Sequence, residues 1–264
     1  MDYSSYQHLL IERQGKVLRV TLNRPEVLNA VNSRLHYELS HIWDDVMYDD
    51  ETDVVVLTGA GRAFSAGGDF PWLLEGLKDR TVGKLSSYEA KQVVFRLLDC
   101  EKPVICRLNG DAIGLGATLA LCCDMVIAAD SARIGDPHVR AGLVAGDGGA
   151  VLWPQLIGYV RAKYYLMTGD LIEARDAVEM GLINRAVPEA ELDEAVDKLA
   201  GKLVAGATKA IRWTKVSANI ALKQLAHGVF DAGIAYELMT QIADDHAEAV
   251  RSFVDKRKPK FTGT

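Results

Sequence analysis

The chain has little of what would direct a protein to nucleic acid or to a membrane. Its formal net charge is −6, and its longest basic stretch is the "DKRKPK" near the C-terminus, so nucleic acid is not expected as a partner. No apolar run reaches the about 18 residues that a membrane span needs. The first residues also lack the basic and then apolar order of a signal peptide. We therefore expect a protein that binds no nucleic acid and no membrane.

Cysteine is scarce as well. The four cysteines lie in apolar segments and form no C-x-x-C pair: Cys100, Cys106, Cys122 and Cys123. This pattern argues against a zinc site, and we predict no bound metal. Buried, reduced thiols are typical of the cytoplasm, which is the location we expect.

What the chain does contain is an ordinary globular composition. Of its 264 residues, 49% are hydrophobic and 25% are charged. This length allows one large domain, or one domain with an appendage, and a large core that needs no disulfide bonds.

The first part of the chain alternates between strand and helix patterns. Residues 8–25 alternate apolar and polar side chains around Gly15, which predicts a hairpin, and residues 32–50 have helical spacing with Asn32 or Ser33 as the cap. Three short apolar runs are typical of strands covered on both faces: residues 53–59, 103–110 and 124–130. A wholly apolar helix is expected between the last two. The alternation predicts an α/β fold with a parallel sheet.

The second part of the chain is predicted to be almost wholly helical. We divide the chain into a core of residues 1–200 and a C-terminal helical region of residues 201–264. That region has more apolar side chains than a small appendage should expose, which predicts contacts with other subunits. These side chains are Trp213, Ile220, Leu225, Phe230, Leu238, Met239 and Ile242.

Two glycine-rich segments, 59–70 and 109–121, each follow a predicted strand. Neither has the spacing of a dinucleotide fingerprint or a phosphate-binding loop. Taken singly, each is explained as a tight turn. Taken together, they offer two backbone N–H groups, one of them at the start of an apolar helix. Two such donors can form an oxyanion hole, each contributing roughly 3–4 kcal/mol to transition-state stabilisation.

Four segments in order resemble the crotonase (enoyl-CoA hydratase/isomerase) superfamily: "NRPEVLNAV", "GRAFSAGGDF", "NGDAIGLGATLALCCDMVIAAD" and "FVDKRKPKF". The resemblance implies a crotonase (ClpP-like) ββα spiral core, with a C-terminal helical region that drives assembly into a homotrimer or a dimer of trimers. It also implies an acyl-CoA substrate, a place in fatty acid metabolism, and no permanently bound cofactor. Coenzyme A would enter only as part of the substrate.

The resemblance also assigns site residues. The oxyanion hole carries over to the amides of Gly68 and Leu115. Substrate contacts carry over to Val27, Leu28, Ala30, Ala66, Gly67, Asp69, Phe70, Gly116, Thr118, Pro137 and Lys256. Lys256 would meet the charged end of coenzyme A, and residues 70–90 would line the acyl pocket.

The chain departs from the family at the two catalytic glutamates of the hydratases. These positions hold Thr118 and His138, so the usual acid–base pair for hydration is missing. Asp147, in "GDGG", resembles in placement the catalytic Asp of naphthoate synthases. A His and an Asp nine residues apart resemble the 6-oxocamphor hydrolases, which cleave β-diketones without coenzyme A. A further His of that branch is absent, because Leu115 occupies its region.

The residue chemistry favours His138 and Asp147 as a catalytic pair. Histidine, with an ordinary pKa of about 6.5, can both take up and release protons near neutrality. The glycines at 146, 148 and 149 would let the loop bring Asp147 back to His138. In the structural alternative, His138 ends a strand and Asp147 caps the next helix. The other histidines are interpreted as structural: His8, His36, His41, His227 and His246.

The sequence therefore predicts an enzyme that acts on an acyl-CoA thioester through an oxyanion-stabilised enolate, with a His/Asp pair in place of two glutamates. The first alternative is a C–C bond hydrolase that cleaves β-diketones without coenzyme A. The second is an acyl-CoA-binding protein with no activity. A serine hydrolase, suggested by "AFSAG" around Ser65, is disfavoured because a loop separates Ser65 from the preceding strand.

Overall fold

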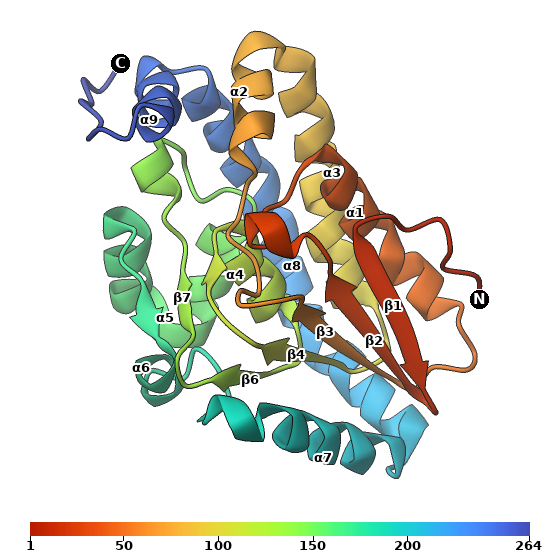
Figure 1. Ribbon diagram of the computed structural model, residues 1–264. Helices are drawn as coiled ribbons and strands as arrows, with labels where there is room; N and C mark the ends of the chain where they lie inside the picture. The colour runs from red at the N-terminus through yellow and green to blue at the C-terminus, as the bar shows by residue number, and fades with distance from the viewer.

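A computed structural model describes the backbone of residues 1–264 and all side chains except those of residues 80 and 82–84. A six-stranded sheet with the order β1-β2-β3-β4-β6-β9 runs through the molecule (Figure 1). The strands are β1 (Leu9–Gln14), β2 (Val17–Leu22), β3 (Val54–Gly59), β4 (Val104–Leu108), β6 (Met125–Ala129) and β9 (Arg185–Val187). The β1–β2 pair is the predicted antiparallel hairpin, and every other neighbouring pair is parallel.

Both faces of the sheet are covered, as the apolar runs predict. On one face, Val54 and Val56 pack with Leu192 and Val196 of α7 (Leu192–Val204). On the other face, Val55 and Leu57 join a larger core with the helices α1 (Ser33–Met47), α3 (Arg80–Asp99) and α4 (Leu115–Cys122). The Asn32 side chain caps α1 by accepting a hydrogen bond from the Leu35 amide at 2.9 Å. The four cysteines are buried and free, as predicted.

A second, three-stranded sheet aligns two loops that matter for the site. It has the order β5-β7-β8, formed by β5 (Ala112–Ile113), β7 (Arg133–Gly135) and β8 (Ile172–Glu173). The Gly114 amide donates to the Gly135 carbonyl at 2.9 Å, directly before α4 begins. This bond fixes the start of α4 beside the chain that leads to His138.

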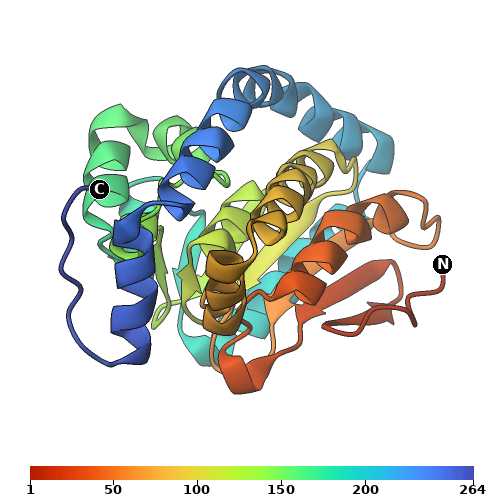
Figure 2. The same cartoon turned by 90° about the horizontal axis from the view of Figure 1, so that it is seen from above.

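The C-terminal helices close over this arrangement (Figure 2). α5 (Gly149–Thr168) bends at Gly158, and after the short α6 (Ala174–Glu179) and α7 the long α8 (Thr208–Gln241) packs against α3 and α5. α9 (Asp244–Val254) then folds back onto α2 (Phe70–Lys78) and the short helix η2 (His138–Ala141). Residue 200 lies within α7, so the predicted division between core and helical region at this residue stays a prediction. Helix α7 packs on the sheet, whereas α8, which follows it, packs on the helices α3 and α5.

The apolar side chains of the C-terminal region have different environments. Phe230 is in the core, where its ring meets the edge of Phe95 at a centroid distance of 5.7 Å, which corrects its expected place at the surface. Leu238 lines a cavity. Trp213, Ile220, Met239 and Ile242 are exposed. Among the described residues, we find no helix that is both long and apolar enough to cross a membrane.

Candidate active site

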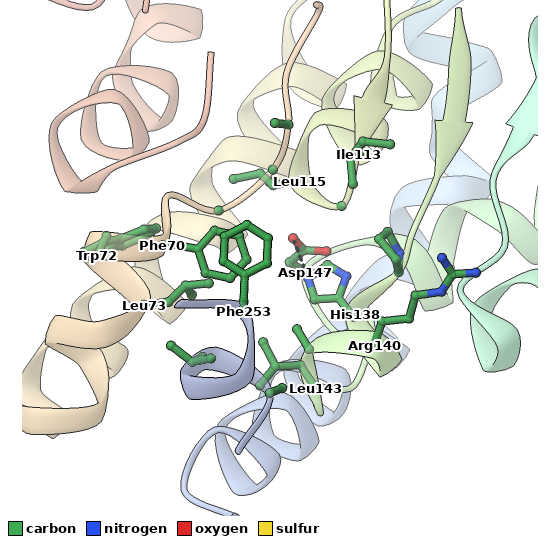
Figure 3. A pocket seen from close by; sticks show the side chains of 18 of the residues that line it. Phe70, Trp72, Leu73, Ile113, Leu115, His138, Arg140, Leu143, Asp147 and Phe253 are labelled. Atoms are coloured by element: carbon green, nitrogen blue, oxygen red, sulfur yellow. Dashed lines mark ion pairs between the residues drawn. The ribbon is translucent and has the colours of Figure 1, made fainter. Parts of the chain in front are cut away.

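A cavity of about 670 Å³ lies between the loops that follow β3 and β4 and the C-terminal helices α8 and α9. Its walls come from α2, from the loops before α2 and α4, from the segment 137–147, and from α8 and α9 (Figure 3). The rings of Phe70 and Phe253 stack at a centroid distance of 3.5 Å and so join α2 to α9 across it. The walls are largely apolar, with polar groups concentrated at a few points, as is typical of a small-molecule site.

The two residues predicted to form an oxyanion hole, Gly68 and Leu115, both lie at the cavity. Gly68 lies between two residues that bond to Val31: Val31 N–H donates to Gly67 at 2.7 Å, and Asp69 N–H donates to Val31 at 2.9 Å. The hydrogen bonds of this parallel bridge come from the amides of Val31 and Asp69, so the Gly68 N–H makes no hydrogen bond within it. Leu115 is the first residue of α4, where a helix amide has no acceptor one turn earlier. Both Gly68 and Leu115 line the cavity.

His138 lies between two carboxylates. Its Nδ1 is hydrogen-bonded to Asp136 Oδ1, and its Nε2 is 3.5 Å from Asp147 Oδ2. The side chains of His138 and Asp147 are only 12% and 9% exposed, and Figure 3 shows them beside each other on the cavity wall. The structure therefore brings together the two residues that the sequence paired, and adds Asp136, which the sequence analysis missed.

The charges in this cluster shift the pKa of His138 and that of Asp147. Burial alone would lower the pKa of His138, but the carboxylates of Asp136 and Asp147 outweigh it and raise this pKa well above 6.5. Burial raises the pKa of Asp147, which the positive charge of His138 opposes. The direction of this shift favours the imidazolium form of His138 at neutral pH.

The glycine-rich loop positions Asp147 through close packing. Gly148 has a φ of 140°, which favours glycine, and it occupies the N-cap position of α5 with no side-chain cap. A Cβ on Gly149 would lie 1.9 Å from Asp136 Oδ2, so only glycine lets the loop approach Asp136. Asp147 consequently does not cap α5, and His138 begins η2 instead of ending β7. The structural alternative for this pair is not what the chain adopts.

Thr118, which occupies one glutamate position of the hydratases, contacts the same carboxylate. It is buried on α4, and its hydroxyl donates a long hydrogen bond of 3.4 Å to Asp147 Oδ1. It does not line the cavity. Its place predicts an effect on the orientation of Asp147 and no direct contact with a substrate.

Glu237 of α8 is a further acid at this end of the cavity, and the sequence analysis missed it. Burial, and then the charge of Asp147, raise the pKa of Glu237 to about 8, and its buried Oε2 has no hydrogen-bond partner among the residues that the structure describes. A signal was present in the sequence, because Glu237 shares a helix face with Ile234, Leu238 and Gln241. All four residues line the cavity. A carboxyl group among apolar neighbours on one helix face is unusual for a solvated surface.

The cluster of Asp136, His138 and Asp147 has donor atoms within 4.8 Å of one another. A metal ion would require one imidazole nitrogen and both carboxylates to converge on one point. Here the two carboxylates engage different nitrogens, so the ring stands between them. The arrangement is a carboxylate–imidazole–carboxylate array, hydrogen-bonded on the Asp136 side and ion-paired on the Asp147 side.

The structure divides the predicted substrate contacts into two groups. Those that line the cavity are Leu28, Ala66, Gly67, Phe70 and Pro137. Those that do not line it are Val27, Ala30, Asp69, Gly116, Thr118 and Lys256, and their contact with a substrate stays a prediction.

Packing explains the second group. Asp69 is buried in an ion pair with Arg24 at 2.8 Å, and the Arg24 guanidinium also bonds to the Ala30 carbonyl. Gly116 packs against Ser65, and Val27 is on the surface. The chain turns at Lys256 with a φ of 52°, and the next residue, Arg257, reaches the cavity wall and is paired with Glu248.

Ser65 does not have the environment of a nucleophile. Its hydroxyl is fully buried and donates to the Asn29 carbonyl at 2.9 Å, and it does not line the cavity. This hydrogen bond gives Ser65 a structural role and removes the serine hydrolase alternative.

Comparisons with known proteins agree with this architecture. The model of the enoyl-CoA hydratase/isomerase family matches residues 12–264. The chain is 34% identical to a crotonyl-CoA hydratase of Syntrophomonas wolfei, covering 97% of this chain and 98% of that protein. The crystal structure of an enoyl-CoA hydratase/isomerase from Mycobacterium paratuberculosis is similar with a TM-score of 0.89 and 36% identity, covering 93% and 98% of the two chains.

A β-diketone hydrolase from the cyanobacterium Anabaena is also similar. Its TM-score is 0.85 at 30% identity, with 91% of this chain and 96% of that chain covered. The fold defines an α/β enzyme of the crotonase type, as the sequence predicted. The chain belongs to the crotonase (enoyl-CoA hydratase/isomerase) superfamily.

Proposed function

We propose that this enzyme moves protons on an enolate formed from an acyl-CoA thioester, and that His138 and Asp147 replace the two glutamates of the hydratases. The observation that carries this proposal is the placement of His138 between two carboxylates in a cavity that Gly68 and Leu115 also line. A thioester oxygen held by the two amides would gain negative charge as the enolate forms. Amides and an imidazolium already in place stabilise such charge.

The protonation states suggest how the two side chains divide the work. Asp147 in its carboxylate form takes a proton from the carbon next to the thioester carbonyl, and the electron pair moves onto the carbonyl oxygen. His138, an imidazolium, then returns a proton to a carbon of the enolate. With a 3-enoyl thioester the enolate is conjugated to the double bond, and return of the proton to the fourth carbon is an isomerisation. Asp147 then passes the proton that it took to His138, 3.5 Å away, which restores both groups. Glu237, neutral below a pKa of about 8, keeps this end of the cavity from gathering further negative charge.

Arginines near the cavity suit the phosphates of coenzyme A. Arg62, Arg133, Arg140 and Arg257 line the cavity. Arg133, Arg140 and Arg257 are paired with carboxylates, whereas Arg62 has no ion pair with any side chain that the structure describes. Arg62 is therefore our candidate for the phosphate contact, a role for which the sequence had favoured Lys256.

A side-by-side assay of crotonyl-CoA, a 3-enoyl-CoA and a cyclic β-diketone tests the proposal. We expect turnover of a thioester that His138→Ala removes while the affinity for the thioester stays within about twofold. Thioester binding with no turnover of any of the three would instead make the protein an acyl-CoA binder.

Hydrolysis of a C–C bond is the second candidate, and the similarity to the β-diketone hydrolase together with the His138–Asp147 contact favours it. Water, giving its proton to Asp147, would add to one carbonyl. The bond between that carbonyl carbon and the central carbon would break, and its electron pair would form the enolate of the second carbonyl. His138 would protonate that carbon, giving a carboxylic acid and a ketone. Turnover of the diketone without any thioester turnover would place this reaction first.

We also propose that the enzyme assembles as a homotrimer or a dimer of trimers in the cytoplasm. Exposed apolar side chains on two helices support assembly: Tyr159, Val160, Tyr164 and Met167 of α5, and Trp213, Ile220, Tyr236 and Met239 of α8. Such a concentration is unusual on a monomer. A sedimentation experiment at micromolar concentration should give three or six times the mass of the chain, and a monomer there would contradict the proposal.

A further inference from the structure

A buried histidine of α9, His246, lies behind the segment that carries His138. His246 is 0% exposed, and its Nδ1 lies 2.7 Å from the carbonyl oxygen of Ala141. Ala141 is the last residue of η2, the short helix that begins with His138. Because a carbonyl oxygen only accepts hydrogen bonds, Nδ1 carries the proton in this contact. His246 therefore joins α9 to the helix on which His138 lies.

The backbones of α9 and η2 also meet closely at this point. Gly142 follows Ala141 with a φ of 67°, a conformation that favours glycine, and a Cβ there would lie only 2.8 Å from the backbone nitrogen of His246. The next residue, Leu143, lines the cavity, and its amide donates to the His138 carbonyl at 2.9 Å. A shift in the first turn of α9 would therefore move the segment that positions His138.

The other ring nitrogen of His246 has no place for a proton. Nε2 is buried and has no hydrogen-bond partner among the residues that the structure describes. Burial lowers the pKa of His246 below its ordinary value of 6.5, the Ala141 carbonyl opposes this shift, and the positive charge of His138 adds to it. The packed arrangement of α9 on η2 therefore holds the neutral imidazole.

The charged groups around His246 offer no compensation for a positive charge on its ring. On α9, Asp245 accepts hydrogen bonds from two amides of the C-terminal tail, and Glu248 is paired with Arg257. The further ionisable side chains at this junction of helices are Asp244 and Arg251 of α9, Arg140 of η2, Glu75 and Lys78 of α2, and Glu237 of α8. In the described part of the chain, none of them has a hydrogen bond or an ion pair with His246.

We propose that His246 in its neutral form is a positioning residue for His138, and that a proton on its Nε2 releases α9 from η2 and so inactivates the enzyme in acid. The importance of His138 rests on the proposed function, whereas the release of α9 does not. Val250 and Phe253 of α9 line the cavity as well. Release of α9 would thus open the cavity wall and displace His138 together.

The direction of the pH effect follows from proton binding. In a released α9 the ring of His246 is solvated and titrates near its ordinary pKa of 6.5, whereas in the packed form its pKa is lower. Between these two values the released form binds more protons, so each fall of one pH unit favours release by up to about tenfold. Above that range, this group makes release no easier.

Hydrogen–deuterium exchange of the full-length protein measures the release without any substrate. Exchange is followed by mass spectrometry of peptides between pH 7.5 and pH 5, and each rate is divided by the intrinsic rate at the same pH. We expect the protection of residues 244–254 to fall by about threefold to tenfold for each pH unit below 6.5. The protection of residues 33–47, in α1, should change by less than about twofold per unit over this range.

Two substitutions assign the effect to the ring of His246. His246→Asn keeps an N–H donor at the place of Nδ1 and takes up no proton in this range, so the pH dependence of residues 244–254 should match that of residues 33–47. His227→Asn is the matched control, because His227 is an exposed histidine of α8 whose ring lies against Phe95. It should keep the pH dependence of the wild type.

A titration of His138 tests the positioning role, again without substrate. The protein is labelled with ¹³C-histidine, and the His138 signal is assigned from its loss in His138→Ala. His246→Leu removes the donor to Ala141, so His138 should move from its place between two carboxylates and its pKa should fall by about 1 unit. In His246→Asn this pKa should stay within about 0.3 unit of the wild type. His246→Met, with a flexible apolar side chain, replaces His246→Leu if that variant does not fold.

Three results would overturn the inference. The first is an equal pH dependence of protection for residues 244–254 and 33–47 in the wild type. The second is a wild-type pH dependence that persists in His246→Asn. The third is an unchanged His138 titration in the variant that lacks the donor. A protein that turns over no thioester would remove the proposed function alone, because neither measurement uses a substrate.

Discussion

The two ends of the cavity hold the same chemical pair, a histidine hydrogen-bonded to a carboxylate, and yet they differ in their surroundings. At one end, His138 has Asp136 on one nitrogen and Asp147 facing the other, with Glu237 near by and two backbone amides in the same wall. At the other end, His36 has Glu89 alone, and its neighbour is an indole. On our proposal, the first end both stabilises an oxyanion and moves protons. The second has a single carboxylate beside its histidine.

The comparison separates a proposed catalytic site from a histidine–carboxylate pair alone. What distinguishes His138 is the second carboxylate, which raises its pKa, and the amides of Gly68 and Leu115 in the same cavity. The predictions below separate the two ends by changing one of them at a time.

The largest effect is expected for His138→Ala. Loss of the proton donor should reduce kcat by about 10²–10⁴-fold, the usual contribution of a general acid, with normal thioester affinity. Steady-state kinetics and calorimetry measure the two quantities. His41→Ala, on α1 and outside the cavity, is the matched control and should retain full activity. If kcat fell by less than about fivefold in His138→Ala, His138 would have a structural role and not a catalytic one.

Asp136→Asn should move the pH profile, whereas Glu89→Gln should not. His138 must be protonated to donate, so activity falls as the pH rises through its raised pKa. Removing the Asp136 charge should shift that alkaline limb down by about 1 pH unit or more. Glu89 is paired with His36, so its change should leave the limb in place. Equal shifts of the alkaline limb in both variants would show that Glu89 influences His138 as strongly as Asp136 does.

Glu237→Gln should change how stability depends on pH. The folded state keeps the Glu237 proton up to its pKa of about 8, whereas the unfolded chain releases it near the ordinary value of 4.5. Between these values the unfolded state binds fewer protons, so this group lowers the free energy of unfolding by about 1.4 kcal/mol for each rise of one pH unit. The variant should lose that slope between pH 5 and pH 8 in chemical denaturation. A slope identical to that of the wild type would contradict the buried, neutral Glu237.

The smallest effect is expected for Thr118→Val. The hydroxyl makes one long hydrogen bond to Asp147, at 3.4 Å, and such bonds are weak. We expect kcat to fall by about twofold to fivefold, from poorer orientation of Asp147, with an unchanged pH profile. A loss as large as that of His138→Ala would mean that Thr118 contacts the reacting atoms.

Local patterns in the sequence account for most of the fold. The alternation around Gly15 and the buried runs at 54–59 and 104–108 determine which faces pack, because the period of a strand is fixed by its geometry. The pairing of His138 with Asp147 was also predictable, since the glycines beside Asp147 indicate a close bend. These signals lie within short stretches of chain.

Contacts between distant segments were not predictable in the same way. Glu237 is 99 positions after His138, and Glu89 is 53 positions from His36, so only the packing of α8 and α3 brings them into the cavity. The indole of Trp72 has a neighbour on α1 for the same reason. His36 was interpreted as structural because it lies within a predicted helix.

Hydrogen exchange at the carbon next to a thioester carbonyl tests the central claim most directly. Hexanoyl-CoA, which has no double bond to react, is incubated with the enzyme in D₂O and followed by proton NMR. If the Gly68 and Leu115 amides hold an enolate that Asp147 and His138 form and reprotonate, the wild type should exchange these protons at least about 100-fold faster than Asp147→Asn or His138→Ala. Equal exchange by all three proteins, or none by a wild type that binds the thioester, would contradict the account.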